Sequence, residues 1–329
     1  MTGHNLDALR QQITESLSRH KASAAQFRKA KTASELHTAL DALSGIDPAD
    51  TENLQKAYQL IRDPKENVVL RLKAISKVIN ALFDDEDAVS DFIKLVSDQK
   101  QPVEIRRAAL YALKAISFSS PALTAKKAAY MQALRGLVDS ADPELRQPAI
   151  EKLAASKDEG VQQRLLEGLK DPGKALLPEE KAIQLLGLDI RAEHYPVIRE
   201  RLTNSTNPLV QQEAIHALSA DPGSQDLIRQ RVQDRKSDKR VRLAGIAALN
   251  AFNALQFQPT LQSLITDETE DHDIRTASLN MLTLHPDLEA VYKDEAFTKA
   301  VEALQYTGNA DLHRLSHTYL VNQARAAKK

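Results

Sequence analysis

Residues 103–113 read Val103-Glu-Ile-Arg-Arg-Ala-Ala-Leu-Tyr-Ala-Leu113. The aliphatic residues Ile105, Leu110 and Leu113 fall on one stripe of a helix. The small residue Ala109 beside that stripe allows a second helix to approach closely. The stretch therefore predicts an amphipathic helix that packs along its length against another helix.

The same pattern, aliphatic-Arg-x-x-small-aliphatic, recurs along the chain with some degenerate copies. Its small residues are Ala74, Ala109, Ala149, Ala182, Ala214, Gly245, Ser278 and Ser316, spaced 31–40 residues apart. A second amphipathic segment precedes each copy, for example Val89 to Val96. Each unit is thus a helix–turn–helix of about 35 residues, which buries its apolar face only by stacking on its neighbours.

Dipeptides of Asp or Asn followed by Pro punctuate the turns. They are Asp63-Pro64, Asp142-Pro143, Asp171-Pro172 and Asn207-Pro208. A short polar side chain at the N-cap with Pro at the first helical position is a helix start signal. We therefore expect helices to begin at these dipeptides.

The stretch Asp142-Pro-Glu-Leu-Arg146-x-x-Ala149-Ile150 and its relatives resemble HEAT repeats. The resemblance implies an all-α fold, an α-solenoid of about eight HEAT-like helix–turn–helix repeats over residues 51–329. Two copies depart from the pattern. One has Pro178 for the aliphatic residue and Glu179 for the arginine, and the last has Ser316 for the alanine, which suits a terminal repeat.

Residues 1–50 lack the repeated motif and are expected to form a separate N-terminal segment. One apolar helical stripe comprises Leu6, Leu9, Ile13, Leu17, Ala24 and Phe27, and a second helix runs from Ser34 to Leu43. The simpler interpretation is a cap over the first repeat. The alternative is a helix pair that docks a partner or a second copy.

Composition excludes several classes of function. The 329 residues include no Cys, which removes disulfides, Cys-based metal sites and thiol nucleophiles. A net charge of −1 gives no global reason to expect nucleic acid or an anionic membrane as partner. We find neither a run of the ~18 apolar residues a membrane span needs nor an apolar leader segment, so we expect a cytoplasmic protein.

Three stretches approach catalytic or metal-binding motifs without completing them. Residues 168–175 nearly spell a phosphate loop, but Ala175 cannot ligate magnesium and Pro172 has no N–H to offer. His313 and His317 share a helical face without the glutamate of a zinc motif, and Glu213-x-x-His216 stands alone. We expect no enzyme, no cofactor and no metal site.

The second helices of a HEAT stack line its concave face, and two positions beside the core stripe point toward it. They hold mostly uncharged polar side chains: Arg107, Tyr111, Gln147, Glu151, Gln184, Gln212, His216 and Asn280 are the candidates. A phosphate-binding groove would hold mainly Lys and Arg. These residues instead favour a protein or peptide partner.

Charge is concentrated in two neighbouring turns. The basic patch comprises Arg229, Arg231, Arg235, Lys236, Lys239, Arg240 and Arg242, and one repeat later residues 267–273 contain five acidic side chains. Equivalent turns stack about 10 Å apart, so mutual compensation is the simpler interpretation. A docking patch for an acidic partner or nucleic acid is the alternative.

The sequence as a whole predicts a non-catalytic scaffold that presents a curved helical surface to a protein or peptide. Two alternatives stay open: nucleic-acid association through the basic patch, and a HEAT-family enzyme resembling the bilin lyases, which share this repeat style. The oligomeric state is left open.

Overall fold

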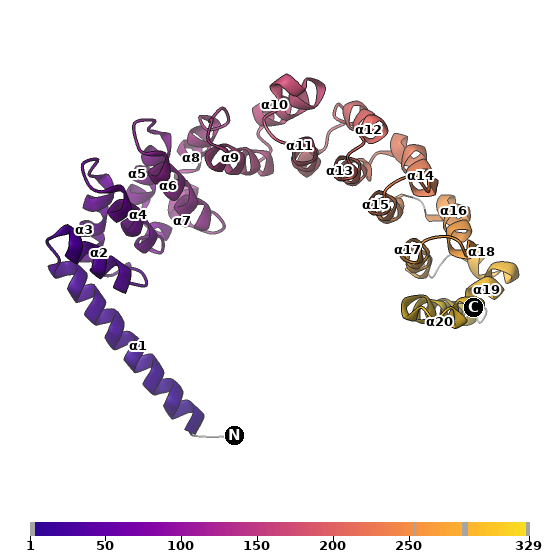
Figure 1. The fold of residues 1–329 in the computed structure, drawn as a ribbon, viewed down its shortest axis with the longest axis horizontal. Coiled ribbons are helices and arrows are strands. Elements are labelled where there is room, and N and C mark those ends of the chain that lie inside the picture. The colour runs from indigo at the N-terminus through magenta and orange to yellow at the C-terminus, as the bar shows by residue number, and fades with distance from the viewer. Residues whose placement is uncertain (1–3, 253, 285–288, 327–329) are drawn as a thin grey trace. The chain divides into compact units, whose positions relative to one another are not determined.

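The computed structural model describes residues 4–252, 254–284 and 289–326, and every regular element within these ranges is an α-helix or a short 3-10 helix (Figure 1). The predicted all-α fold is therefore confirmed. The chain divides into two compact units, Met1–Leu153 and Ala154–Lys329. Each unit is a stack of helix pairs.

The first unit is built from helix pairs whose second members form one row. Its elements are α1 (His4–Lys29), α2 (Ala33–Ala42), α3 (Thr51–Arg62), α4 (Val68–Lys77), η1 (Ala81–Phe83), α5 (Glu86–Ser97), α6 (Val103–Ala115), α7 (Pro121–Ala125), α8 (Lys127–Arg135) and most of α9 (Pro143–Ala155). Helix α3 packs on α4 and α5 on α6, while α2, α4 and α6 are successive neighbours. The order of helices is that of an α-solenoid.

The second unit repeats this arrangement in two rows. Its elements are α10 (Glu159–Lys170), η2 (Pro172–Lys174), α11 (Glu179–Leu186), η3 (Gly187–Asp189), α12 (Tyr195–Asn204), α13 (Pro208–Leu218), η4 (Pro222–Ser224), α14 (Gln225–Gln233), α15 (Lys239–Leu249), α16 (Ala254–Thr266), α17 (His272–Thr283), α18 (Glu289–Tyr292), α19 (Glu295–Ala303), η5 (Leu304–Tyr306) and α20 (Ala310–Ala326). Helices α11, α13, α15, α17 and α20 form an inner row on the concave side of this unit, and α10, α12, α14, α16 and α19 form an outer row (Figure 1).

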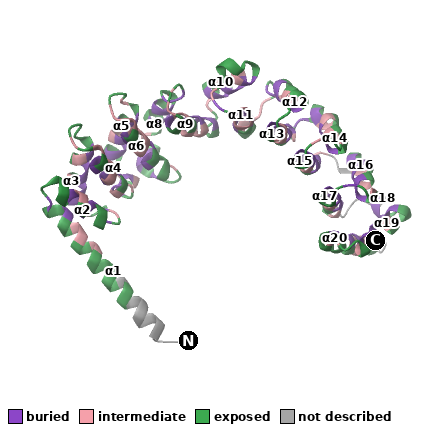
Figure 2. Ribbon diagram, viewed as in Figure 1, coloured by how far each residue is buried: buried purple, intermediate pink, exposed green. Residues whose placement is uncertain are grey.

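The repeated motif supplies the core between the rows, as its spacing predicted (Figure 2). Its first aliphatic residues, Leu70, Ile105, Leu145, Val210, Val241 and Ile274, are all buried. The small positions are buried as well. A Cβ atom on Gly245 would lie 2.5 Å from Val232 Cγ2, so α14 and α15 come together more closely than an alanine there would allow.

Two of the four expected helix starts are present. The Asn207 side chain accepts the N–H of Leu209 at 3.0 Å, with Pro208 as the first residue of α13. The Asp142 carboxylate accepts the N–H of Glu144 at 2.9 Å at the start of α9. These caps satisfy backbone donors that the first turn of a helix leaves without partners.

The other two starts were wrongly predicted. Asp63 ends α3, and its carboxylate accepts the N–H of Lys65 at 2.9 Å within a turn; Asn67 caps α4 instead. Asp171 and Pro172 begin only the short helix η2, and α11 starts at Glu179. In both places the connection is longer than the dipeptide suggests, because the aspartate closes a turn of its own first.

The motif arginine makes one hydrogen bond that recurs along the chain. In four copies its Nε donates to the carbonyl ten residues earlier, near the end of the preceding helix: Arg71 to Ile61 (3.0 Å), Arg106 to Val96 (3.0 Å), Arg242 to Val232 (2.8 Å) and Arg275 to Ile265 (3.0 Å). Arg146 and Gln211 donate to carbonyls six residues earlier. A cation is favoured at a helix C-terminus, where carbonyls lack partners within the helix.

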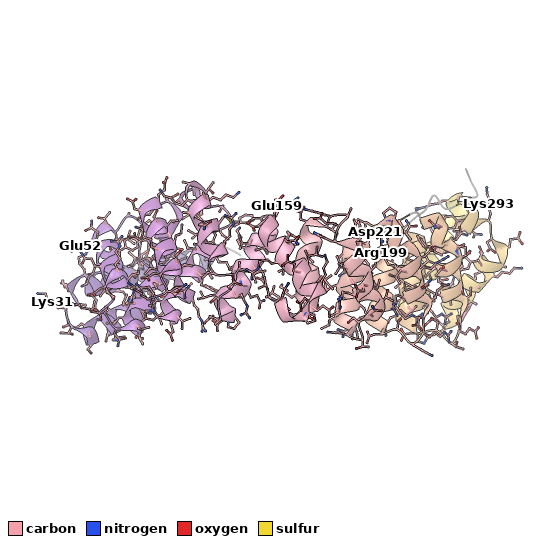
Figure 3. All side chains as sticks on the ribbon, turned by 90° about the horizontal axis from the view of Figure 1, so that it is seen from above. Lys31, Glu52, Glu159, Arg199, Asp221 and Lys293 are labelled. Atoms are coloured by element: carbon pink, nitrogen blue, oxygen red, sulfur yellow. The ribbon has the colours of Figure 1, made fainter. Side chains whose placement is uncertain are left out.

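Cations on the first helix of a pair also make contacts with neighbouring repeats. Arg231 on α14 donates to the carbonyls of Leu202 and Thr203 at the end of α12. Arg199 on α12 contacts Asp221 and donates from Nε to Ser224 Oγ at 2.9 Å, which ties α12 to η4 (Figure 3). Successive repeats are therefore joined by polar side chains as well as by apolar packing.

The N-terminal helices pack in the manner of a repeat. Lys56 on α3 donates to the carbonyls of Phe27 and Ala30 at the end of α1 (2.7 and 2.6 Å), as Arg231 does at the end of α12. Phe27 is buried, whereas Leu17 is 57% exposed, and the side chains of Leu6, Leu9 and Ile13 lie outside the described part. The assignment of residues 1–50 as a separate cap or docking segment stays a prediction.

We expect Arg275→Met to lower the free energy of unfolding by about 1.5–3 kcal/mol, because it leaves the Ile265 carbonyl without its charged donor in the interior. Urea unfolding followed by circular dichroism measures the change. Arg314→Met is the control: that arginine is 65% exposed and pairs with Asp311 on the same helix, so a loss below about 0.5 kcal/mol is expected. Equal losses in the two variants would contradict a structural role for the motif arginine.

Candidate functional site

Four of the candidate binding residues lie on the inner row of the second unit. They are Gln184 on α11, Gln212 and His216 on α13, and Asn280 on α17. Gln184, His216 and Asn280 are exposed and Gln212 is half-buried. Since each helix of this row packs on its partner in the outer row and on its neighbours at either side, the exposed mid-helix positions face the open side of the row.

Two of the polar groups on this face contact a charged side chain of their own helix. Gln184 Oε1 accepts from Lys181 Nζ at 3.0 Å, and His216 Nδ1 lies 3.7 Å from Glu213 Oε2. Asn280 belongs to α17, two helices further along the row. Amide and imidazole groups presented in this way can both donate and accept hydrogen bonds, as an exposed peptide backbone requires.

The other four candidates lie in the first unit or on α9. Arg107 is engaged: its Nε donates to Asp142 Oδ2 at 2.9 Å and its Nη1 lies 3.1 Å from Glu144 Oε1. This hydrogen bond from Arg107 lowers the pKa of the Asp142 carboxyl. Gln147 donates to Glu151 at 3.0 Å on α9.

Tyr111 is highly accessible, with 73% of its surface exposed on α6. Arg107 and Asp142 therefore join α6 to the start of α9, whereas Tyr111 leaves a large aromatic surface in solvent. An exposed aromatic of this kind is typical of a contact residue.

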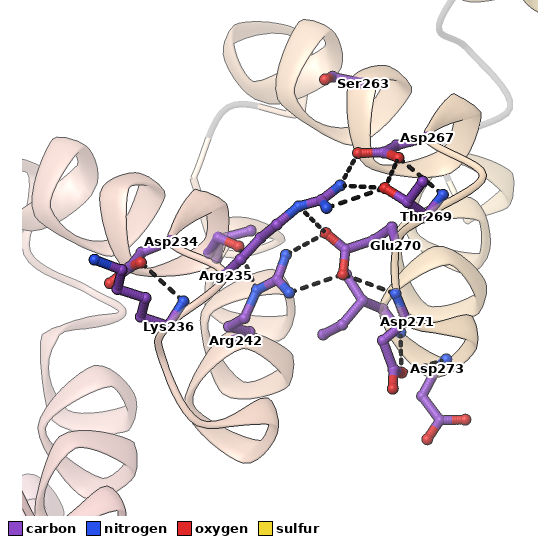
Figure 4. A network of polar contacts seen from close by, with 12 residues as sticks. Asp234, Arg235, Lys236, Arg242, Ser263, Asp267, Thr269, Glu270, Asp271 and Asp273 are labelled. Carbon is purple, nitrogen blue, oxygen red and sulfur yellow. Dashed lines mark hydrogen bonds and ion pairs between the residues drawn. The ribbon is translucent and has the colours of Figure 1, made fainter.

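The basic patch faces acids of the next repeat (Figure 4). Arg235 contacts Asp267 and donates to Thr269 Oγ1 at 3.0 Å. Lys239 lies 3.2 Å from Asp271 Oδ1 and also contacts Asp273, and these carboxylates raise the pKa of its ammonium. The compensation between neighbouring turns is therefore present in the structure.

Arg242 lies in the interior and not on an exposed patch. Its Nη1 and Nη2 donate to the two carboxylate oxygens of Glu270 at 2.8 and 2.6 Å, and both side chains are about 95% buried. This bidentate contact is the main reason why the pKa of the Glu270 carboxyl is lowered. Arg242 is the motif arginine of its repeat, and its role is to stabilise the packing of the helices.

The remaining members of the patch are more exposed, except Arg231, whose guanidinium caps α12. Arg229 lies 2.8 Å from Asp226, and Arg240 lies 3.5 Å from Asp238. Lys236 is exposed, and its backbone N–H donates to Asp234 at 2.9 Å. A cleft of about 480 Å³ between the two turns is lined by both signs of charge. Nothing in this arrangement is dominated by cations in the way a phosphate-binding surface is.

Within the described ranges, no group of three or more His, Asp or Glu side chains is placed to hold a metal ion. Over the same part of the chain, no helix has both the length and the apolar character that a bilayer crossing demands.

The comparison with protein families concerns α12 to α17. Residues 195–283 match the family described as HEAT repeats. This segment is a run of HEAT repeats. It contains three successive helix pairs of the second unit, and further helix pairs of that unit lie on both sides of it.

Solved structures agree at the level of the fold. A Kap121p mutant aligns with 95% of this chain and 44% of its own, at 15% identity and a TM-score of 0.52, so the chain spans less than half of that protein. Two others have lower TM-scores. The CpcE–CpcF complex of phycocyanin lyase from Nostoc sp. PCC7120 gives 0.36, at 16% identity over 82% of this chain and 94% of its own. The UNC-45 chaperone, which binds and folds muscle myosin, also gives 0.36, at 14% identity over 98% and 53%. No curated protein matches the chain.

Sequence reasoning missed the cations that cap helix ends. Lys56 and Lys77 donate to main-chain carbonyls of α1 and of Leu43, and neither belongs to a motif that was recognised. One signal was present: Lys56 and Arg231 both follow their acceptors by 29 residues, close to one repeat. The spacing of cations relative to helix ends would have found them.

We expect Glu270→Gln to lower the free energy of unfolding by about 3–5 kcal/mol at pH 7, because it leaves the buried Arg242 without its carboxylate. A lowered pKa in the folded state means that Glu270 stabilises the fold above its unfolded pKa, near 4.5, and that this contribution is lost as pH falls. The difference in free energy of unfolding between wild type and variant should therefore become smaller below about pH 4.5. Urea unfolding midpoints of the wild type and the variant, measured over a range of pH, test this expectation. Glu302→Gln, at an exposed position, is the control. A gap independent of pH would contradict it.

Proposed function

We propose that this chain is a non-catalytic scaffold that binds a protein or peptide along the inner row of its second unit. One observation carries the proposal: Gln184, His216 and Asn280 are exposed on three helices of that row. They lie on a frame of buried motif residues that needs no rearrangement to present them. Binding to a preformed surface avoids much of the entropy cost of ordering.

The chemistry of the row suits a polypeptide. Amides and imidazoles pair with main-chain N–H and C=O groups, and the helices repeat at a regular interval that an extended chain can follow. The fold is also that of a karyopherin, Kap121p, at a TM-score of 0.52, which supports a HEAT scaffold and says nothing of the partner. The cytoplasmic location expected from the sequence belongs to the same proposal.

The nucleic-acid alternative gains no support from the geometry. Arg235 and Lys239 pair with acids of the next turn, and Arg242 is buried against Glu270. Binding phosphates there would require breaking these pairs. Among the described residues, no cluster argues for the bilin-lyase alternative.

Triple substitution of Gln184, His216 and Asn280 by Ala should weaken partner binding by about tenfold or more, because each loses a hydrogen-bonding group on the contact face. The partner is captured from native lysate with the wild-type chain, identified by mass spectrometry, and titrated against each variant.

A matched control changes three exposed glutamines of the outer row of the same unit. Gln163→Ala, Gln230→Ala and Gln256→Ala lie on α10, α14 and α16. The control should keep wild-type affinity. Loss in the control but not in the inner-row variant would overturn the proposed surface. A steep fall of affinity with salt, removed by charge reversal at Arg235, Lys236, Lys239 and Arg240, would favour nucleic acid instead.

A further inference from the structure

The repeat formed by α10 and α11 lacks the motif arginine. Glu179 stands at its position, after Pro178 in place of the aliphatic residue. In four other repeats that arginine donates to the carbonyl ten residues earlier, which here is the carbonyl of Leu169. The space that an arginine side chain fills in those repeats is therefore not filled from within this one.

A cavity of about 110 Å³ lies at this place. It is formed by the end of α10, η2 with the residues after it, the start of α11, and α12. Its apolar lining includes Leu165, Leu169, Pro172, Ala175, Leu177 and Ala182. A Cβ atom on Gly168 would lie 3.0 Å from Ala175 Cα, so the loop after η2 lies directly against α10 and closes one side of the cavity.

Arg201 on α12 and Glu179 at the start of α11 contribute the charged part of the lining. Its side chain is 22% exposed, and its Nε is buried without a hydrogen-bond partner among the described residues. Glu179 Oε1 lies 3.5 Å from this same Nε, and Glu200 Oε1 lies 3.6 Å from Nη2 of the guanidinium. The cavity thus combines an apolar interior with a buried Nε that is ion-paired with Glu179 but makes no hydrogen bond among the described residues.

These charges restrict what the cavity accepts. A carboxylate placed on Arg201 would face Glu179 and Glu200, and a cation would face Arg201 itself. A neutral acceptor such as a peptide carbonyl meets neither repulsion and satisfies the buried donor. A cavity of this size is somewhat smaller than the ~150 Å³ that holds benzene, so it takes a group of about four carbon atoms.

We infer that this cavity binds one leucine-sized aliphatic side chain of a partner peptide, whose own main-chain carbonyl accepts a hydrogen bond from Arg201 Nε. The inference rests on the proposed function in taking a polypeptide as ligand. It concerns a separate site, because the cavity is lined by α10, α12, the loop after η2 and the start of α11, and by none of Gln184, His216 and Asn280.

The test is a titration of the full chain, labelled at leucine methyl groups, with N-acetyl-L-leucine methylamide. We expect saturable NMR shifts at the methyls of Leu165, Leu169 and Leu177. N-acetyl-L-alanine methylamide should bind at least about tenfold more weakly, because it lacks three of the carbon atoms that make apolar contact. The carboxylate 4-methylpentanoate should bind more weakly than the leucine amide, because its charge faces Glu179 and Glu200.

Variants locate the site. Ala175→Leu fills the cavity from an exposed rim position and should weaken binding at least tenfold. Ala128→Leu, an equally exposed alanine on α8, should leave it unchanged. Arg201→Lys, which removes the Nε donor and keeps the charge, should weaken binding of the leucine amide several-fold.

The titration of the wild-type chain needs no variant to fold. Absence of saturable shifts at these methyls, equal affinity for the alanine amide, or tighter binding of 4-methylpentanoate would each overturn the inference. Its failure is distinct from failure of the proposed function: the capped leucine reports on the cavity alone, and the inner-row variant Gln184→Ala, His216→Ala, Asn280→Ala leaves the cavity lining intact.

Discussion

The hydrogen bond from the motif arginine to the end of the preceding helix joins the two helices of a pair in four repeats. A helix end leaves carbonyls without partners, and burying them between two helices is costly unless a donor reaches them. Arg71 meets this need for Ile61 and also donates to Gln101 of the next repeat at 2.7 Å. One planar guanidinium thus joins the two helices of a pair and also contacts the next pair.

This arrangement has a consequence for the surface. A solenoid has no contacts between distant repeats, so each interface must be held by its own residues. Cations such as Arg235 and Lys239 are therefore engaged at the turns by acids of the following repeat. The net charge of −1 conceals this ordered alternation. What remains for recognition is the inner row, where Gln184, His216 and Asn280 are exposed.

The fold could be predicted because a short period of aliphatic and small residues determines how helix pairs stack. The site was predictable only in part. Arg242 was placed on a surface patch because charge counted along the chain does not say which side chains point inward. Its place in the same motif column as Arg71 and Arg275 did carry that information. Asp63 and Asp171 misled in the same way, since a turn and a helix start use the same residue types.

A departure from the repeat motif removes a contact that another group has to replace. If a residue of the fold replaces it, the departure is structural; if none does, the departure points to a function. In the last copy Ser316 replaces the alanine, and its buried Oγ donates to the Val301 carbonyl at 2.6 Å, so this departure is satisfied within the fold. At Glu179 the departure leaves a cavity and a buried Arg201 Nε without a hydrogen bond. A polar atom buried beside empty apolar space costs stability. That cost has a physical purpose if a ligand supplies the missing contact.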